Sequence, residues 1–136
     1  MSILYSVLQQ KHDLTGKNSL KYYAKTKSSG ETDFKSLCRE MSDSSSINKG
    51  DIMAVLDGCI RIMSRALSDG KIVRLGEFGS FQIGLSSEGA LSEKAFNSSK
   101  ITKAKILFRP GEDLTQMLTD LTYQKIKKPN DLFLEK

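Results

Sequence analysis

The pattern of hydrophobic and polar positions near the start of the chain predicts a β-hairpin. Residues 3–10 and 20–26 are short stretches rich in leucine, tyrosine and β-branched side chains, and a polar segment containing Gly, Asn, Asp and Ser separates them. Two such stretches around a turn-forming segment are typical of paired strands. Residues 27–30, KSSG, then break the pattern, so we expect the hairpin to end there.

A helical period follows the hairpin. Apolar side chains between Phe34 and Met41 recur at the spacing i, i+3, i+4, i+7, which puts them on one face of a helix. Thr32 or Asp33 can cap this helix, and the serine-rich residues 42–46 end it.

A second, longer helix is predicted directly afterwards. Asn48 as N-cap and Asp51 in the first turn supply the acceptor and the negative charge that a helix start favours. Apolar residues hold one face from Ile52 to Leu67, and Gly70 supplies a left-handed stop. Because one short partner helix cannot cover a stripe of this width, we expect a packed sheet or a dimer interface against it.

The period changes to two after this helix. Residues 72–75 and 78–83 alternate as strands do, and Gly76 and Gly79 interrupt them as at a tight turn or bulge. Residues 85–100 are polar and are predicted to be irregular, with a helical turn around residues 92–96.

The last elements are a third strand and a third helix. Residues 103–109 form the strand, and Pro110 and Gly111 end it. Glu112 and Asp113 then open a helix with apolar residues at helical spacing, and a tail follows it. The predicted order is two strands, two helices, three strands and one helix.

Charge indicates the class of partner. The chain has 136 residues, 38% hydrophobic and 27% charged, with a formal net charge of +5, which is typical of one ordinary globular domain with modest extensions. Residues 71–111 carry seven basic and three acidic side chains, and residues 1–31 carry five basic and two acidic. Because the excess lies in the predicted strands, those strands are the candidate surface for a polyanion.

Nothing in the sequence indicates catalysis, a metal or a cofactor. The single histidine, His12, lies in a predicted polar turn, where a solvated side chain is expected. Cys38 and Cys59 lie in apolar helical stripes without metal-ligand spacing, so both are expected to be free thiols. Apolar runs are far shorter than the ~20 residues of a membrane span, and the first residues lack a secretory signal pattern. We expect a cytoplasmic protein that is not an enzyme and has no small-molecule substrate.

Two motifs resemble a known family. Residues 70–81, GKIVRLGEFGSF, are similar to the helix end, strand and glycine turn of the bacterial histone-like DNA-binding proteins of the HU and integration host factor type. Residues 108–114, FRPGEDL, are similar to the segment that leads into the last helix of that family. The resemblance covers residues 32–122. The added hairpin is similar to that of longer HU-like proteins of Bacteroidetes that lack the DNA-bending arm.

One segment departs from the family pattern. In HU-type proteins the two strands after the glycine turn extend into a basic arm whose proline wedges between base pairs in the minor groove. Residues 84–104 here, GLSSEGALSEKAFNSSKITKA, contain no proline and no arginine, and they include Glu88 and Glu93. We therefore expect weak DNA bending.

The resemblance implies a fold and an assembly. The fold is α+β and HU-like (integration host factor-like), with two N-terminal helices, a three-stranded antiparallel sheet and a C-terminal helix, preceded by the extra hairpin. The expected parts are the hairpin extension at 1–31, the HU-like domain at 32–124 and the tail at 125–136. The functional unit is expected to be an intertwined homodimer, which agrees with the broad apolar stripe of the second helix.

The candidate DNA-binding residues are cations of the predicted strands. Alternation over residues 103–109 puts three cations and Leu107 on one face, and Ala104, Ile106 and Phe108 on the other. The expected phosphate contacts are Lys71, Arg74, Lys103, Lys105 and Arg109, and the candidates for an extension of this surface are Lys21, Lys25 and Lys27. A solvated outer sheet face is the alternative interpretation of the strand cations, and lysines on a hairpin edge also discourage aggregation.

Two functions agree with these features. The first is a histone-like, sequence-tolerant, nucleoid-associated protein that binds DNA as a homodimer, which the basic strand favours. The second is a structural or protein-interaction module that kept the HU-like dimer body but lost the DNA-bending arms. Glu88 and Glu93, in the position of the arm, favour this alternative.

Overall fold

The computed structural model describes residues 1–12 and 19–127, and the chain divides into two compact units. Unit 1 comprises Met1–Asp33 together with Thr119–Lys136, and unit 2 comprises Phe34–Leu118. The first and last segments of the chain therefore belong to one unit, and the helices and strands between them form the other.

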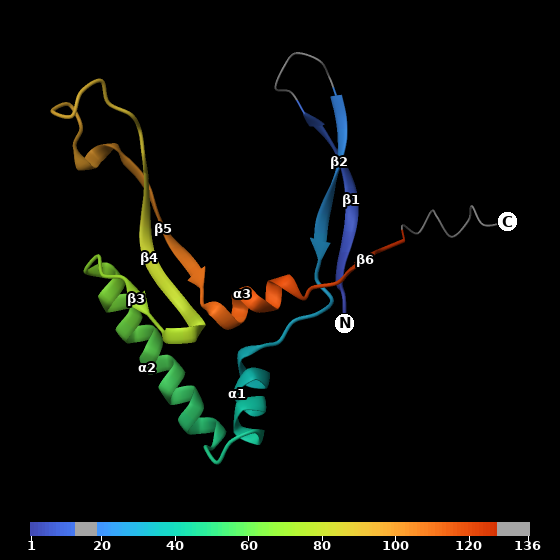
Figure 1. Cartoon of the computed structure of the whole chain (residues 1–136). Coiled ribbons are helices and arrows are strands. Elements are labelled where there is room, and N and C mark those ends of the chain that lie inside the picture. Colours follow the sequence, from blue (N-terminus) through green and yellow to red (C-terminus); the bar gives the residue numbers. More distant parts are fainter. Residues whose placement is uncertain (13–18, 128–136) are drawn as a thin grey trace. The chain divides into compact units, whose positions relative to one another are not determined.

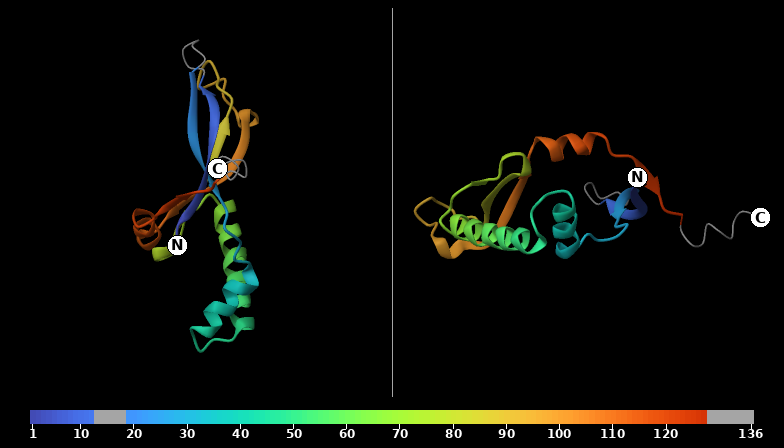
Figure 2. Two further views of the ribbon diagram at one scale, coloured as in Figure 1. Left: turned by 90° about the vertical axis from the view of Figure 1, so that its right-hand side faces the viewer. Right: turned by 90° about the horizontal axis from the view of Figure 1, so that it is seen from below.

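Unit 1 contains the predicted hairpin. β1 (Ile3–His12) and β2 (Ser19–Lys27) pair antiparallel and run side by side (Figure 1 and the left view of Figure 2). The hairpin prediction is confirmed. His12 is the last residue of β1, so its predicted place in a turn is wrong.

A third strand completes this sheet. β6 (Tyr123–Lys125), which the sequence did not predict, adds in parallel to β1 and gives the order β2-β1-β6. The Ile3 N–H donates to the Thr122 carbonyl over 2.8 Å, and the Ile126 N–H donates to the Tyr5 carbonyl over 2.9 Å. The tail predicted for residues 125–136 thus begins within this strand, and from residue 128 on it lies outside the described residues.

Unit 2 begins with the two predicted helices, α1 (Phe34–Asp43) and α2 (Lys49–Ser68). Asn48 caps α2 as predicted, because its Oδ1 accepts a 2.9 Å hydrogen bond from the Asp51 N–H. At the other end Gly70 has φ +74°, and the N–H groups of Gly70 and Lys71 donate to the carbonyls of Leu67 and Ala66 over 3.0 Å. These two bonds satisfy the last carbonyls of the helix and turn the chain sharply away from its axis.

A three-stranded antiparallel sheet with the order β3-β4-β5 follows. Its strands are β3 (Val73–Arg74), β4 (Gly79–Ser87) and β5 (Ile101–Pro110), and the 3-10 turn η1 (Gly76–Phe78) connects β3 to β4. β5 leads into α3 (Glu112–Thr119), as predicted. β4 continues to Ser87, so the irregular segment begins at residue 88 and not at residue 85.

The connection between β4 and β5 is irregular as predicted. The predicted turn is present, since the N–H groups of Ala95 and Phe96 donate to the carbonyls of Ser92 and Glu93. The short 3-10 helix η2 (Ser98–Lys100) then leads into β5. In Figure 1, β4 and β5 form a long two-stranded ribbon that this connection closes.

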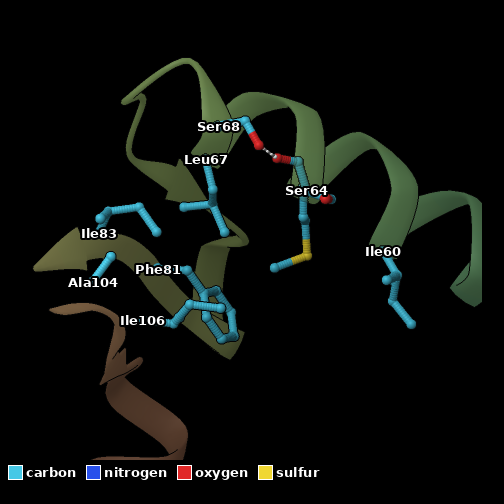
Figure 3. A pocket seen from close by; sticks show the side chains of 9 residues that line it. Ile60, Ser64, Leu67, Ser68, Phe81, Ile83, Ala104 and Ile106 are labelled. Carbon is cyan, nitrogen blue, oxygen red and sulfur yellow. Dashed lines mark hydrogen bonds between the residues drawn. The ribbon is translucent and has the colours of Figure 1, made fainter.

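The apolar face of the unit 2 sheet lies beside α2. Phe78, Phe81 and Phe108 form an aromatic cluster with ring centroids 4.9–6.2 Å apart. A cavity of about 620 Å³ separates α2 from the strands, and its lining residues are Ile60, Met63, Ser64, Leu67, Ser68, Phe81, Ile83, Ala104 and Ile106 (Figure 3). Among hydrophobic side chains of the described residues, only Cys38, Ile52 and Leu67 are buried. In this part of a single chain, most of the large apolar side chains are therefore exposed.

Candidate nucleic-acid interface

The strand register divides the unit 2 sheet into two faces. On β5, Lys103, Lys105 and Arg109 lie opposite Ser86, Gly84 and Ser80 of β4. Directly paired residues of antiparallel strands share a face, so the three cations lie on one side of the sheet together with small or polar partners. Ala104, Ile106 and Phe108 lie on the opposite, apolar side, opposite Leu85, Ile83 and Phe81. The predicted alternation of residues 103–109 is confirmed. We call the first side the basic face; its cations are Arg74, Lys103, Lys105 and Arg109.

A row of polar residues crosses the basic face at one end. Ser80 pairs with Arg74 of β3 on one side and with Arg109 of β5 on the other. Both arginines line a hollow of about 260 Å³, together with Ser80, Gln82, Leu107, Ile72 and Phe108. A guanidinium group presents a planar fork of donors that matches a phosphate, so two of them at one hollow form a suitable anion site.

The basic face contains no negative charge. β3, β4 and β5 carry no Asp or Glu side chain. Arg74, Lys103, Lys105 and Arg109 are exposed, and none of them forms an ion pair within residues 1–12 and 19–127. Within this part of the chain the four cations have no carboxylate partner and are available to an external anion.

Lys71 lies apart from the basic face. It follows Gly70 in the turn that ends α2, and its Nζ lies 3.8 Å from Asp69 Oδ2. Both side chains are exposed. The structure therefore gives Lys71 a neighbouring carboxylate that the four strand cations do not have.

The three candidate lysines of the hairpin occupy β2 in unit 1. Lys21, Lys25 and Lys27 are exposed and share one face of the strand. They belong to unit 1, whereas the basic face belongs to unit 2.

Sequence reasoning missed the polar residues of β4. Ser80, Gln82 and Ser86 lie on the basic face between the cations of the neighbouring strands and supply hydrogen-bonding groups there. The sequence pattern that could have found them is their alternation with the apolar residues Phe81, Ile83 and Leu85. A search restricted to charged side chains does not find them.

The remaining chemistry is sparse. Cys38 is a buried free thiol and Cys59 a partly buried one, as predicted. Within the described residues no three His, Cys, Asp or Glu side chains gather in a way that could hold a metal ion. In the same part of the chain, no helix is both long and apolar enough to cross a membrane.

Comparison with known proteins gives a family and a fold. The family model described as "HU domain fused to wHTH, Ig, or Glycine-rich motif" (HU-HIG) matches residues 1–125. One similar solved structure is described as a "Putative bacterial DNA binding protein" from Bacteroides vulgatus ATCC 8482, with a TM-score of 0.64 and 12% sequence identity. The match covers 94% of this chain and 50% of that one, so this chain spans about half the length of the solved protein. No protein of curated function matches the sequence.

Proposed function

The chain belongs to the HU-HIG family, and from this membership we propose that it is a histone-like, sequence-tolerant DNA-binding protein that acts as a homodimer. The observation that carries the proposal is the basic face of the β3-β4-β5 sheet. Its four exposed cations have no carboxylate among them and no ion-pair partner in the described part of the chain. DNA as partner would place the protein at the nucleoid, in the cytoplasm.

The spacing of the cations suits a phosphate backbone. Alternate residues of an antiparallel strand lie about 6.8 Å apart. Successive phosphates of one DNA strand wind around the helix axis and so lie farther apart through space than their ~3.4 Å axial rise. The spacing of Lys103 and Lys105 therefore suits neighbouring phosphates of one strand. Contacts of this kind give affinity and orientation but do not read bases, which is why the binding is expected to tolerate sequence.

The apolar side of unit 2 supports a homodimer. Ile60 of α2 is 61% exposed and Ile106 of β5 is 63% exposed, and both line the cavity between the helix and the sheet. Contiguous apolar surface of this kind is unusual on a soluble monomer and marks an association site. A second copy of the chain is the occupant that the HU resemblance implies. If the apolar sides of two copies pack against each other, the basic face of each copy remains available to DNA.

The alternative function is a protein-interaction module built on the same dimer body. It is favoured by the connection between β4 and β5, where Glu88 and Glu93 are exposed and Leu91 is fully exposed. Carboxylates in this position repel a phosphate backbone, whereas an exposed leucine can contact a protein. This function predicts only weak DNA binding, which the β5 cations do not control.

A salt titration separates the two functions. Fluorescence anisotropy with one random-sequence duplex would compare the full chain with the variant K103Q/K105Q/R109Q. Each lost phosphate contact lowers the slope of log K against log[salt] by ~0.9, so the variant should lose about 2.7 slope units per chain and about 5 per dimer. The control K35Q/R39Q/R61Q removes the same charge from exposed helix positions and should change the slope little.

Two results would overturn the proposal. One is the absence of wild-type binding at ~50 mM salt, where the electrostatic contribution is strong. The other is an equal loss of slope in the β5 variant and in the helix control, since the basic face would then contribute only general charge. Circular dichroism and sedimentation of each variant establish that it is folded and associated like the wild type.

A further inference from the structure

Unit 1 repeats the cation pattern of the basic face. β2 has the sequence K-x-Y-x-K-x-K over residues 21–27, and β5 has K-x-K-x-L-x-R over residues 103–109. Each strand thus carries three cations and one large apolar or aromatic side chain at alternate positions. Because alternate positions share a face, both units present a strip of three cations to one side of a sheet.

The register of the hairpin places the lysines beside uncharged residues. Lys21, Lys25 and Lys27 pair with Gln10, Ser6 and Leu4 of β1. Tyr23, between them on the same face, pairs with Leu8. β2 is an edge strand, since the sheet order is β2-β1-β6, and all its residues from Leu20 to Lys27 are exposed. The lysine strip therefore lies at the accessible border of the sheet.

The sheet of unit 1 has only positive charge. β1, β2 and β6 together contain five lysines and no Asp or Glu. The acidic residues in the described part of this unit, Glu31, Asp33 and Asp120, lie outside the strands. Lysines that only protect an edge strand against aggregation can stand beside carboxylates in the same sheet. That role therefore does not explain why the strands of this sheet contain no Asp or Glu. A surface of one sign indicates a partner of the opposite sign.

We propose that the lysine strip of β2 is a second DNA-contacting surface, which binds phosphates of duplex DNA. The proposal rests on the proposed function and extends it from unit 2 to unit 1. Lys25 and Lys27 are one two-residue step apart, about 6.8 Å, a spacing that suits neighbouring phosphates, and Lys21 lies two further steps along the same face. Each chain then engages DNA through two connected surfaces, and the second contact forms at a raised effective concentration.

The test uses the full chain and four variants. K21Q/K25Q/K27Q removes the β2 strip, K103Q/K105Q/R109Q removes the β5 strip, a sextuple variant removes both, and K35Q/R39Q/R61Q is the charge-matched control. Glutamine removes the positive charge and keeps a polar side chain that is shorter than lysine or arginine. Salt titrations on the random duplex give a slope for each, and sedimentation checks that the variants remain associated like the wild type.

We expect the β2 variant to lose up to about 2.7 slope units per chain and the sextuple variant to lose the sum of the two triple variants. If the salt slope of the β2 variant equals that of the helix control while the salt slope of the β5 variant is reduced, this inference is overturned and the proposed function stays intact. A wild type that does not bind duplex at ~50 mM salt would overturn the proposed function itself. Binding of polyglutamate that the β2 substitutions abolish, with no loss of duplex slope, would assign the strip to an acidic protein segment and also overturn the inference.

Discussion

Two adjacent residues of β5 test which face of the unit 2 sheet joins the two copies. Ile106 lines the apolar cavity beside α2, whereas Leu107 lies on the basic face opposite Gln82. The substitution Ile106→Gln places an amide on the apolar side, and Leu107→Gln places the same amide on the other side. We predict that the first substitution dissociates the homodimer and that the second leaves it intact.

The size of the effect follows from the exposure of Ile106. Complete burial of an isoleucine side chain contributes about 1.5–3 kcal/mol. Because 63% of Ile106 is exposed in the single chain, a partner that covers it would contribute about 1–2 kcal/mol per copy and about 2–4 kcal/mol per dimer. This corresponds to a rise in the dimer dissociation constant of roughly 30- to 700-fold. An amide left without hydrogen-bond partners in the interface adds to this loss.

Sedimentation equilibrium over nanomolar to micromolar concentrations measures the dissociation constant directly. Far-ultraviolet circular dichroism establishes that each variant keeps its helices and strands. Leu107→Gln is the matched control, since it changes the same chemistry one residue away on the same strand, where Leu107 is 39% exposed on the basic face. Its dissociation constant should stay within a few-fold of the wild type.

Three results would refute this reasoning. A wild type that is monomeric at micromolar concentration would show that the exposed apolar side does not join two copies. Equal weakening by both substitutions would show that the effect comes from the strand and not from its apolar face. A dimer that only Leu107→Gln disrupts would place the interface on the basic face and remove that face from the proposed DNA surface.

Two further substitutions test the local structure around these faces. Gly111→Ala should lower the free energy of unfolding by about 1–3 kcal/mol in urea titrations, because the added Cβ would overlap the Glu77 carbonyl. Gly89→Ala is the control: its added Cβ meets nothing within 4 Å, so the free energy of unfolding should change by less than about 0.5 kcal/mol. Asn48→Ala should cost about 1 kcal/mol in the same assay, since the cap of α2 is lost, and an unchanged urea midpoint would contradict the capping role.

Local chemistry was sufficient to predict the elements whose signals lie within a few residues. The N-cap of α2 at Asn48 and its stop at Gly70 were predicted because capping and left-handed geometry depend on the residues at the helix ends themselves. The two faces of β5 were predicted because alternation over residues 103–109 is complete. In each case the residues that determine the local structure are close neighbours in the sequence.

The errors have non-local causes. β6 is three residues long and has no alternating apolar run, and it exists because it pairs with β1 at the other end of the chain. The polar composition of residues 85–100 predicts an irregular segment from residue 85 on, but pairing with β5 holds residues 85–87 in β4. The role of Lys71 in DNA binding stays a prediction, and the turn after α2 places its Nζ 3.8 Å from Asp69 Oδ2. Contacts between distant segments decide both β6 and the end of β4.

The register of the unit 2 sheet would link the proposed homodimer to the proposed DNA contact. In a strand of period two, a shift of pairing by one residue would exchange the faces and bring Lys103 and Lys105 to the apolar side. The aromatic cluster of Phe78, Phe81 and Phe108 opposes such a shift, since it would lose its packing against the sheet. The only register shift between β4 and β5 falls between Ser86 and Ser87, at the far end of the cation strip. The packing that holds the apolar side in register therefore also fixes the cations on the opposite side. A homodimer formed through the apolar sides, as we propose, would thus also set the orientation of the two basic faces.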